Sequence, residues 1–202
     1  MLKNIPVFVT GGGGFIGSHL VERLVQEQAR VTAFLHYNSR GDWGLLEQLP
    51  RDILQEVQVV QGDIRDAATL MKAVQSHEMV FHLAALIGIP YSYVAPDAYV
   101  ATNVQGTLNM LEAARAAGVR RFIHTSTSEV YGTARYVPIN EEHPLQGQSP
   151  YSATKIAADK LVESYICSFE FPASVLRSFN NFGPRQSARA VIPTIIDRKS
   201  VV

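Results

Sequence analysis

The apolar residues of the chain form short runs that alternate with longer amphipathic segments. Short apolar runs between turn residues are typical of buried strands, and a period of 3.6 residues is typical of helices. Strands are expected at residues 5–9, 30–35, 56–60, 79–83, 121–125 and 173–179. Helices are expected at residues 15–28, 66–75, 97–117 and 151–165. This alternation predicts an α/β fold, a Rossmann-like doubly wound parallel sheet with helices on both faces.

Capping residues mark several of the expected helix ends. Asp66 and Asp97 begin two helical patterns, and we expect both to be N-caps, because a carboxylate can accept hydrogen bonds from the first free amides of a helix. Gly118 follows the second of these helices, where glycine commonly ends a helix. We expect irregular loops at residues 36–50 and 126–150.

Composition limits the class of protein. The chain has 202 residues, 47% of them hydrophobic, which suffices for one domain with a sizeable core. The formal net charge is zero, so we expect no nucleic-acid or membrane partner. No apolar run has transmembrane length and no signal-peptide pattern precedes the first strand, so we expect a cytoplasmic protein. Cys167 is the only cysteine and is expected in the core, and the six histidines show no metal-binding spacing.

Four consecutive glycines follow the first strand and open the first helix. Gly12, Gly14 and Gly17 fit G-x-G-x-x-G, whereas Gly11, Gly14 and Gly17 fit G-x-x-G-x-x-G. Either spacing brings backbone amides to a helix N-terminus, where they bind a pyrophosphate. Ser18 occupies the position at which a phosphate-transfer P-loop requires lysine, so a dinucleotide site is expected. The alternative is a glycine-rich turn without a ligand.

The residues after the next two strands bear on the choice of dinucleotide. An acid at the end of the second strand would bind the ribose hydroxyls of NAD, but none is present there. Ser39 and Arg40 would instead favour the 2′-phosphate of NADP, unless Arg40 is a solvated loop residue. Asp63 is placed to contact the adenine, unless it caps a turn. Both NAD and NADP stay open at this point.

Tyr151 and Lys155 form a Tyr-x-x-x-Lys pair within the expected helix of residues 151–165. Positions i and i+4 share one face of a helix. A neighbouring cation lowers the pKa of a tyrosine, which can then exchange a proton with a sugar hydroxyl near neutral pH. The alternative is an exposed helix with an incidental pair.

Hydroxyl groups and one carboxylate gather at the end of the fifth strand, and carboxyl ends of parallel strands line the binding crevice of such sheets. A hydroxyl there can bond to the oxygen that Tyr151 deprotonates, and a carboxylate can abstract a proton next to a carbonyl. The alternative is ordinary turn chemistry, with Glu129 as a solvated loop residue. The group comprises Thr125, Ser126, Thr127, Ser128 and Glu129.

The chain divides into one NAD(P)-binding Rossmann-like domain, residues 1–196, and a short tail, residues 197–202. A helical pattern starts at residue 191 and stops a few residues later, at the end of the chain. We expect a truncated C-terminal substrate part and a tail that is not native. The alternative is a naturally short version of this fold.

Taken together, the motifs resemble the extended short-chain dehydrogenases/reductases, the NAD-dependent epimerases and dehydratases that act on nucleotide sugars. The matching segments span nearly the whole chain in the order of the family. They are residues 10–17, 62–63, 82–85, 103–107, 125–132, 151–155, 177–180 and 183–184. Finer segments at 36–39, 89–93 and 131–151 look like the legionaminic-acid-type 4,6-dehydratases that act on UDP-N-acetylglucosamine.

The resemblance implies NAD(P) as cofactor, a nucleotide sugar as substrate and a role for each matched residue. Tyr151 would take the proton of the sugar 4-hydroxyl, Lys155 would lower its pKa and hold the nicotinamide ribose, and Thr127 or Ser126 would complete the proton relay. Glu129 would remove the C5 proton of the 4-keto sugar, after which water leaves from C6. Ser126 and Asn180 would contact the substrate. Cofactor contacts would come from Gly11, Gly14, Phe15, Ile16, Gly17, Asp63, Ile64, Leu83, Ala84, Ala85, Tyr151 and Lys155.

Ser128 departs from the pattern of the deoxyhexose-forming dehydratases, which carry Thr-Asp-Glu where this chain has Thr127-Ser128-Glu129. The aspartate there is the acid for the leaving hydroxyl, and a serine is a poor acid. Thr-Ser-Glu also occurs in relatives that decarboxylate UDP-glucuronic acid, and 4-epimerases share the Tyr/Lys pair. A dehydratase, an epimerase, a decarboxylase and a non-catalytic dinucleotide-binding fragment therefore all stay open. The family also implies a homodimer for the full-length protein.

Overall fold

A single parallel sheet organises the computed structural model, which describes residues 2–188 and 190–199. Within these residues the sheet has six strands in the order β3-β2-β1-β4-β5-β6. All five strand pairs are parallel, so the predicted doubly wound sheet is confirmed. The strands are β1 (Pro6–Thr10), β2 (Arg30–His36), β3 (Val57–Gly62), β4 (Met79–His82), β5 (Arg121–Thr125) and β6 (Ala173–Leu176).

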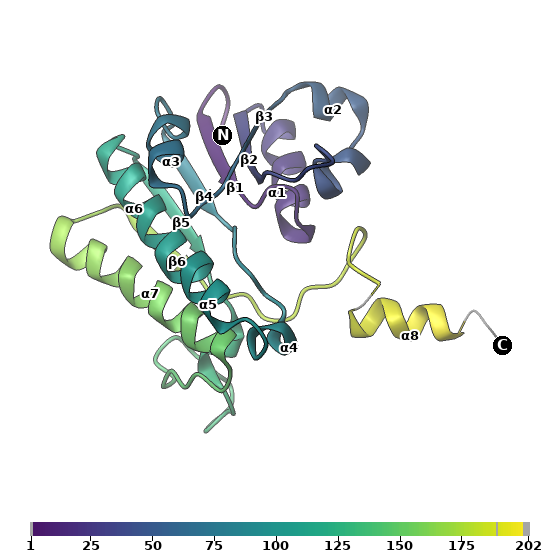
Figure 1. Cartoon of the computed structure of the whole chain (residues 1–202), viewed down its shortest axis with the longest axis vertical. Coiled ribbons are helices and arrows are strands. Elements are labelled where there is room, and N and C mark those ends of the chain that lie inside the picture. Colours follow the sequence, from purple (N-terminus) through teal and green to yellow (C-terminus); the bar gives the residue numbers. More distant parts are fainter. Residues whose placement is uncertain (1, 189, 200–202) are drawn as a thin grey trace.

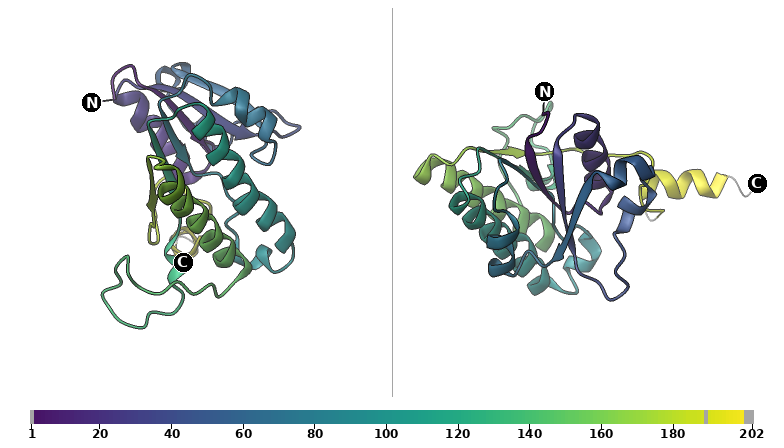
Figure 2. Two further views of the ribbon diagram at one scale, coloured as in Figure 1. Left: turned by 90° about the vertical axis from the view of Figure 1, so that its left-hand side faces the viewer. Right: turned by 90° about the horizontal axis from the view of Figure 1, so that it is seen from above.

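Helices cover both faces of this sheet (Figure 1). One face carries α1 (Phe15–Gln26) and the short α2 (Arg51–Gln55), which follows a 3-10 turn at Gly44–Gln48. The other face carries α3 (Ala67–Ala73), α6 (Gly106–Ala116) and α7 (Pro150–Phe169). A smaller helix, α8 (Val191–Lys199), projects away from the sheet and its helices (Figure 2).

The side chains of β1 show why the strands bury both faces. Val7 and Val9 belong to one hydrophobic cluster, together with Val21 and Leu24 of α1. Phe8, between them, points to the opposite cluster. Because successive strand residues face opposite sides of a sheet, a central strand covered by helices on both faces must be apolar throughout.

Two predicted residues at helix ends are confirmed. Asp66 is the N-cap of α3, and its carboxylate accepts hydrogen bonds from the amides of Ala68 and Thr69. Gly118 follows α6 with a φ of +67°, the left-handed conformation that glycine adopts without strain.

The prediction that Asp97 is an N-cap is wrong. The N-cap of α5 (Pro96–Tyr99) is Ala95, and Asp97 lies within the first turn of that helix. Pro96 occupies the first helical position, which suits its fixed φ and missing amide proton, so the helix starts two residues earlier than the aspartate indicated. Another short helix, α4 (Ile89–Ser92), precedes α5, and a π-helical turn at Val100–Gln105 joins α5 to α6.

Four further expectations differ from the structure. The loop at residues 126–150 contains a 3-10 turn at Ser128–Tyr131, and β6 ends at Leu176 instead of residue 179. Helix α7 continues to Phe169, and Cys167 is exposed rather than buried. The expected domain boundary at residue 196 stays a prediction. Helix α8 spans Val191–Lys199, and residues 200–202 of the expected tail lie outside the described residues.

No helix in the described part of the chain combines the length and apolar character that crossing a membrane requires.

We predict different effects for the two aspartates. Asp66→Ala should lower the Tm by about 2–4 °C, because two amides of α3 lose their acceptor. Asp97→Ala removes no capping bond and should change the Tm by less than about 1 °C. Thermal unfolding followed by circular dichroism measures both. Equal losses in the two variants would contradict the assignment of the cap.

Candidate active site

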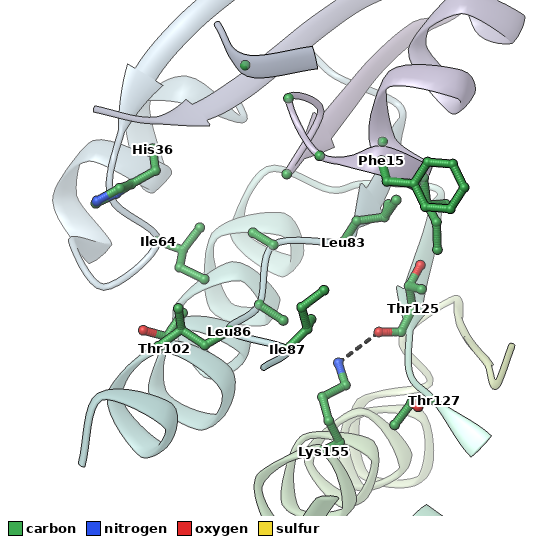
Figure 3. A pocket seen from close by; sticks show the side chains of 18 of the residues that line it. Phe15, His36, Ile64, Leu83, Leu86, Ile87, Thr102, Thr125, Thr127 and Lys155 are labelled. Atoms are coloured by element: carbon green, nitrogen blue, oxygen red, sulfur yellow. Dashed lines mark hydrogen bonds between the residues drawn. The ribbon is translucent and has the colours of Figure 1, made fainter. Parts of the chain in front are cut away.

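A cavity of about 890 Å³ lies at the carboxyl ends of the strands (Figure 3). Its volume is at the upper end of the roughly 300–1,000 Å³ found for ligand pockets. The sheet order reverses at β1 and β4, the switch point at which open α/β sheets bind their ligands. Of the residues expected in a cofactor, catalytic or substrate role, the following line this cavity: Gly11, Gly14, Phe15, Ile16, Gly17, Asp63, Ile64, Leu83, Ala84, Ala85, Ser126, Thr127, Ser128, Glu129, Tyr151, Lys155 and Asn180.

The glycine turn leaves the N-terminus of α1 open. Its N-cap is Gly14, which makes no side-chain cap hydrogen bond. A Cβ on Gly17 would lie 2.1 Å from the carbonyl oxygen of Gly11, and a Cβ on Gly11, whose φ is +74°, would lie 2.8 Å from the amide nitrogen of Ala84. Glycine is therefore required at both positions for turn and helix to pack. Such an amide-lined cradle fits the pyrophosphate of a dinucleotide.

Two buried polar residues hold the segment after β4 against this turn. The Thr10 hydroxyl accepts hydrogen bonds from the amides of Leu83 and Ala84, both at 3.2 Å, and lies 2.8 Å from Nδ1 of His82. The Asn103 amide exchanges two hydrogen bonds with the backbone of Leu86, at 2.8 and 2.9 Å. This fixes one wall of the cavity.

The ends of β2 and β3 supply a polar corner. Asp63 accepts a hydrogen bond from the amide of Arg65 at 2.8 Å, and the Arg65 guanidinium holds the pKa of Asp63 below its usual value. Neither Ser39 nor Arg40 lines the cavity, whereas Asp42 does. The Arg40 side chain is 83% exposed and pairs with Asp42 at 2.7 Å. The expected 2′-phosphate contact from Ser39 and Arg40 therefore has no support in the geometry.

Lys155 is buried, one helical turn after Tyr151 on α7. Its Nζ donates a hydrogen bond to the carbonyl oxygen of Thr125 at 2.8 Å, and Figure 3 shows this contact. Burial lowers the pKa of Lys155 to about 8, although Asp159 acts in the opposite direction.

The pKa of Tyr151 is raised, mainly by burial, while a hydrogen bond with Thr127 acts against the rise and Glu129 adds to it. The expectation that the pKa of Tyr151 is lowered is thus wrong, because burial outweighs the groups that lower it. At neutral pH the phenol is protonated.

The backbone after β5 is rigidly paired. The amides of Ser126 and Ser128 donate to the carbonyl oxygens of Leu176 and Ser178, at 2.8 and 2.9 Å. Thr127 caps the following 3-10 turn by accepting a bond from the amide of Glu129 at 3.2 Å.

The Ser126 hydroxyl oxygen is buried without a hydrogen-bond partner among the described residues, whereas Glu129 is exposed. A free hydroxyl and a solvated carboxylate thus stand at the same strand end.

A loop after β6 closes another side of the cavity and is tied to α1. Arg185 pairs with Glu22 at 2.6 Å, and Nε2 of His19 lies 2.9 Å from the carbonyl oxygen of Pro184. These contacts position the lining residues Ser178, Phe179, Asn180, Asn181 and Gln186.

Several lining residues were not indicated by the sequence. Leu86, Ile87 and Ile89 follow β4, so the rule that strand ends line the crevice could have suggested them. Ala98 and Thr102 belong to helical turns that reach the cavity only through tertiary packing. Within the described residues, no group of three or more His, Cys, Asp and Glu side chains could hold a metal ion.

The extended short-chain dehydrogenases/reductases combine the same three features: the parallel sheet, the glycine turn and the helix with the Tyr-x-x-x-Lys pair. The chain belongs to the family described as GDP-mannose 4,6 dehydratase, whose model matches residues 8–200. The family resemblance read from the motifs is therefore confirmed.

Two curated relatives show how much of such proteins the chain covers. It is 37% identical over 198 residues to the low-salt glycan biosynthesis protein Agl12 of Haloferax volcanii, covering 96% of this chain and 62% of that protein. It is 36% identical over 201 residues to the dTDP-glucose 4,6-dehydratase of an Actinoplanes species, with the same coverage of 96% and 62%. The chain thus spans about three fifths of the length of these relatives.

Solved structures of similar proteins are also matched over nearly all of this chain but only part of their own length. The UDP-N-acetylglucosamine 4-epimerase of Methanobrevibacter ruminantium matches with a TM-score of 0.90 at 33% identity, over 98% of this chain and 64% of that one. A DesIV double mutant, a dTDP-glucose 4,6-dehydratase of Streptomyces venezuelae solved with NAD, matches with a TM-score of 0.85 at 31% identity, over 96% of this chain and 62% of that one.

Proposed function

We propose that the protein is an NAD-dependent enzyme that modifies a nucleotide sugar, beginning with oxidation at C4 of the sugar and continuing as a 4,6-dehydration. The observation that carries this proposal is the placement of Tyr151, bonded to Thr127, in one cavity with the glycine turn. The 4,6-dehydratases among the relatives support the reaction class. The likeness of residues 36–39 and 89–93 to legionaminic-acid-type enzymes supports UDP-N-acetylglucosamine as the substrate.

NAD is the proposed cofactor, with NADP as the alternative. The glycine turn would hold its pyrophosphate, and Asp63 and Ile64 would border the adenosine half. Asp42, a carboxylate in the lining, supports NAD, because it would repel a 2′-phosphate. The chemistry that the dinucleotide supplies when bound is reversible acceptance of a hydride.

The chain's own groups would move the protons. Tyr151 Oη would accept the proton of the 4-hydroxyl. Its raised pKa means that it needs help, which Thr127 supplies by a hydrogen bond, while Lys155 would hold the nicotinamide ribose of the bound dinucleotide. The buried Ser126 hydroxyl would donate to the same sugar oxygen. Glu129 would take the C5 proton, made acidic by the adjacent ketone, and Asn180 would contact the substrate.

Ser128 supports a second candidate, 4-epimerisation. A serine offers no carboxylic acid to protonate a leaving hydroxyl, and the solved M. ruminantium neighbour is a 4-epimerase. A UDP-glucuronate-type decarboxylase shares the Thr-Ser-Glu pattern and is a further alternative. A homodimer in the cytoplasm is proposed from the family resemblance and the single free cysteine.

Product analysis tests these reactions. The protein is incubated with NAD⁺ and UDP-N-acetylglucosamine, and the sugar nucleotide is followed by mass spectrometry and chromatography. Loss of one water supports dehydration, whereas an unchanged mass with a new sugar establishes epimerisation. UDP-glucuronic acid in a parallel incubation tests decarboxylation. Stabilisation by NAD⁺ without turnover of either sugar would overturn the proposal in favour of a non-catalytic dinucleotide-binding chain.

A further inference from the structure

Helix α7 carries a third chemically active residue on the face of Tyr151 and Lys155. Asp159 stands one turn beyond Lys155, at the same spacing of four residues. Its side chain is 0% exposed, and aspartate is almost never fully buried unless it is paired. A buried anion beside a buried lysine calls for a physical account.

The two oxygens of this carboxylate have different surroundings. Oδ2 accepts a hydrogen bond from Nε of Arg177 at 2.9 Å. Oδ1 lies 3.6 Å from Nε2 of His124 and accepts no hydrogen bond from the described residues. The same His124 nitrogen lies 3.4 Å from Nζ of Lys155. The carboxylate is therefore anchored on one side and faces the lysine, across the imidazole, on the other.

Few of the groups near Lys155 carry charge. Burial lowers the pKa of His82 to about 3 and that of His124 well below its usual value, so both rings are neutral. The phenol of Tyr151 is protonated, and Glu129 is an exposed group that acts on Tyr151. Asp159 is thus the buried anion nearest the lysine along α7. The facing groups are His82 from β4, His124 from β5, Glu129 from the following turn, Tyr151 and Asp159 from α7, and Arg177 from the end of β6.

We propose that Asp159 is a positioning residue, which Arg177 holds in place and which keeps Lys155 charged and directed at the end of β5. For its catalytic meaning this inference rests on the proposed function. The electrostatic effect of Asp159 has the direction that this role requires. It opposes the fall in the pKa of Lys155 that burial causes. A lysine with a pKa of about 8 is close to losing its proton in the physiological range, so its counterion decides its charge.

Direct titration of Lys155 tests the proposal without any substrate. The protein is produced with isotopically labelled lysine, and the side-chain NMR signal absent from Lys155→Met is followed against pH. In Asp159→Asn we expect the pKa of Lys155 to fall by at least about one unit, a tenfold change in the ratio of ammonium to amine. Glu163→Gln is the matched control, since Glu163 also pairs with Arg177, at 3.5 Å, but is 38% exposed.

A second variant covers the case in which Asp159→Asn does not fold, as judged by circular dichroism. Arg177→Gln removes the hydrogen bond that holds the carboxylate in place, so the pKa of Lys155 should fall in this variant too. A fall of the pKa of Lys155 in both variants, with Glu163→Gln unchanged, supports the proposal. An unchanged pKa in the folded variants, or an equal fall in Glu163→Gln, would overturn it.

Activity provides a separate readout. If turnover requires the ammonium, the alkaline limb of the kcat profile moves to lower pH in Asp159→Asn, and Asp159→Glu restores part of the shift. One outcome is that the protein turns over no nucleotide sugar while the pKa of Lys155 still shifts as expected in the variants. This result would refute the proposed function but would support the role of Asp159. An unmoved alkaline limb in an active Asp159→Asn enzyme counts against that role.

Discussion

Tyr151→Phe is expected to lower the turnover of a nucleotide sugar by at least about 10³-fold, within the range that general acid–base groups contribute. The phenol carries an exchangeable proton and bonds to Thr127, and both residues line the cavity. Phenylalanine keeps the ring, which packs edge-on against Tyr99 with centroids 6.3 Å apart. NAD affinity should therefore stay within about twofold, as measured by calorimetry.

Tyr165→Phe is the matched control for this substitution. Tyr165 lies on the same helix and is also buried, but its hydroxyl bonds to Glu112 and it does not line the cavity. Turnover in this variant should stay near that of the wild type. Comparable turnover in Tyr151→Phe and the wild type would rule out the proton transfer assigned to Tyr151.

The second large effect is expected for Gly17→Ala. In an ordinary helix alanine is favoured over glycine by about 1 kcal/mol. Here the new Cβ would lie 2.1 Å from the Gly11 carbonyl oxygen. Because this distance is too short for two unbonded atoms, the backbone of the glycine turn must move. We expect unfolding free energy to fall by about 1–3 kcal/mol, the usual cost of overpacking. NAD affinity should fall by at least tenfold, about 1.4 kcal/mol, because the amides of the cradle shift.

Gly118→Ala separates this clash from the general cost of losing a glycine. Its φ is +67°, and nothing lies within 4 Å of the added Cβ. The variant should lose about 1–2 kcal/mol from backbone strain and bind NAD normally. Urea unfolding and calorimetry measure both quantities. Normal NAD binding by Gly17→Ala would contradict the place of the dinucleotide.

Much of the fold and of the site follows from local sequence. Short apolar runs separated by helical periodicity predict a parallel sheet, and the rule that ligands bind at strand ends gathers residues as distant as Gly11 and Asn180 around one cavity. What local sequence cannot supply is the direction of a side chain. Lys155 shares a face with Tyr151, yet its ammonium turns to the Thr125 carbonyl, because that acceptor is delivered by β5.

The local sequence also does not predict which polar residues are buried. The local sequence gives no reason to bury the charged Asp159, and only the pairing with Arg177, which follows β6, makes its burial tolerable. The reverse holds for Cys167, whose apolar neighbours on α7 suggested the core although the end of that helix is exposed. In both cases the deciding contacts, or their absence, lie outside the local sequence.

The hydrogen bond between Thr10 and His82 joins residues 72 positions apart, at the switch point of the sheet. The amides of Leu83 and Ala84 bond to the same hydroxyl, so the cradle acquires its second wall only when the β1–β4 pairing is complete. A sheet in which β1 and β4 are not yet paired therefore lacks the binding cavity. It follows that a ligand of this cavity binds only the assembled sheet and stabilises all of it. The free energy of unfolding rises by RT ln(1 + [L]/Kd), which is about 2.7 kcal/mol when the ligand concentration is a hundred times Kd.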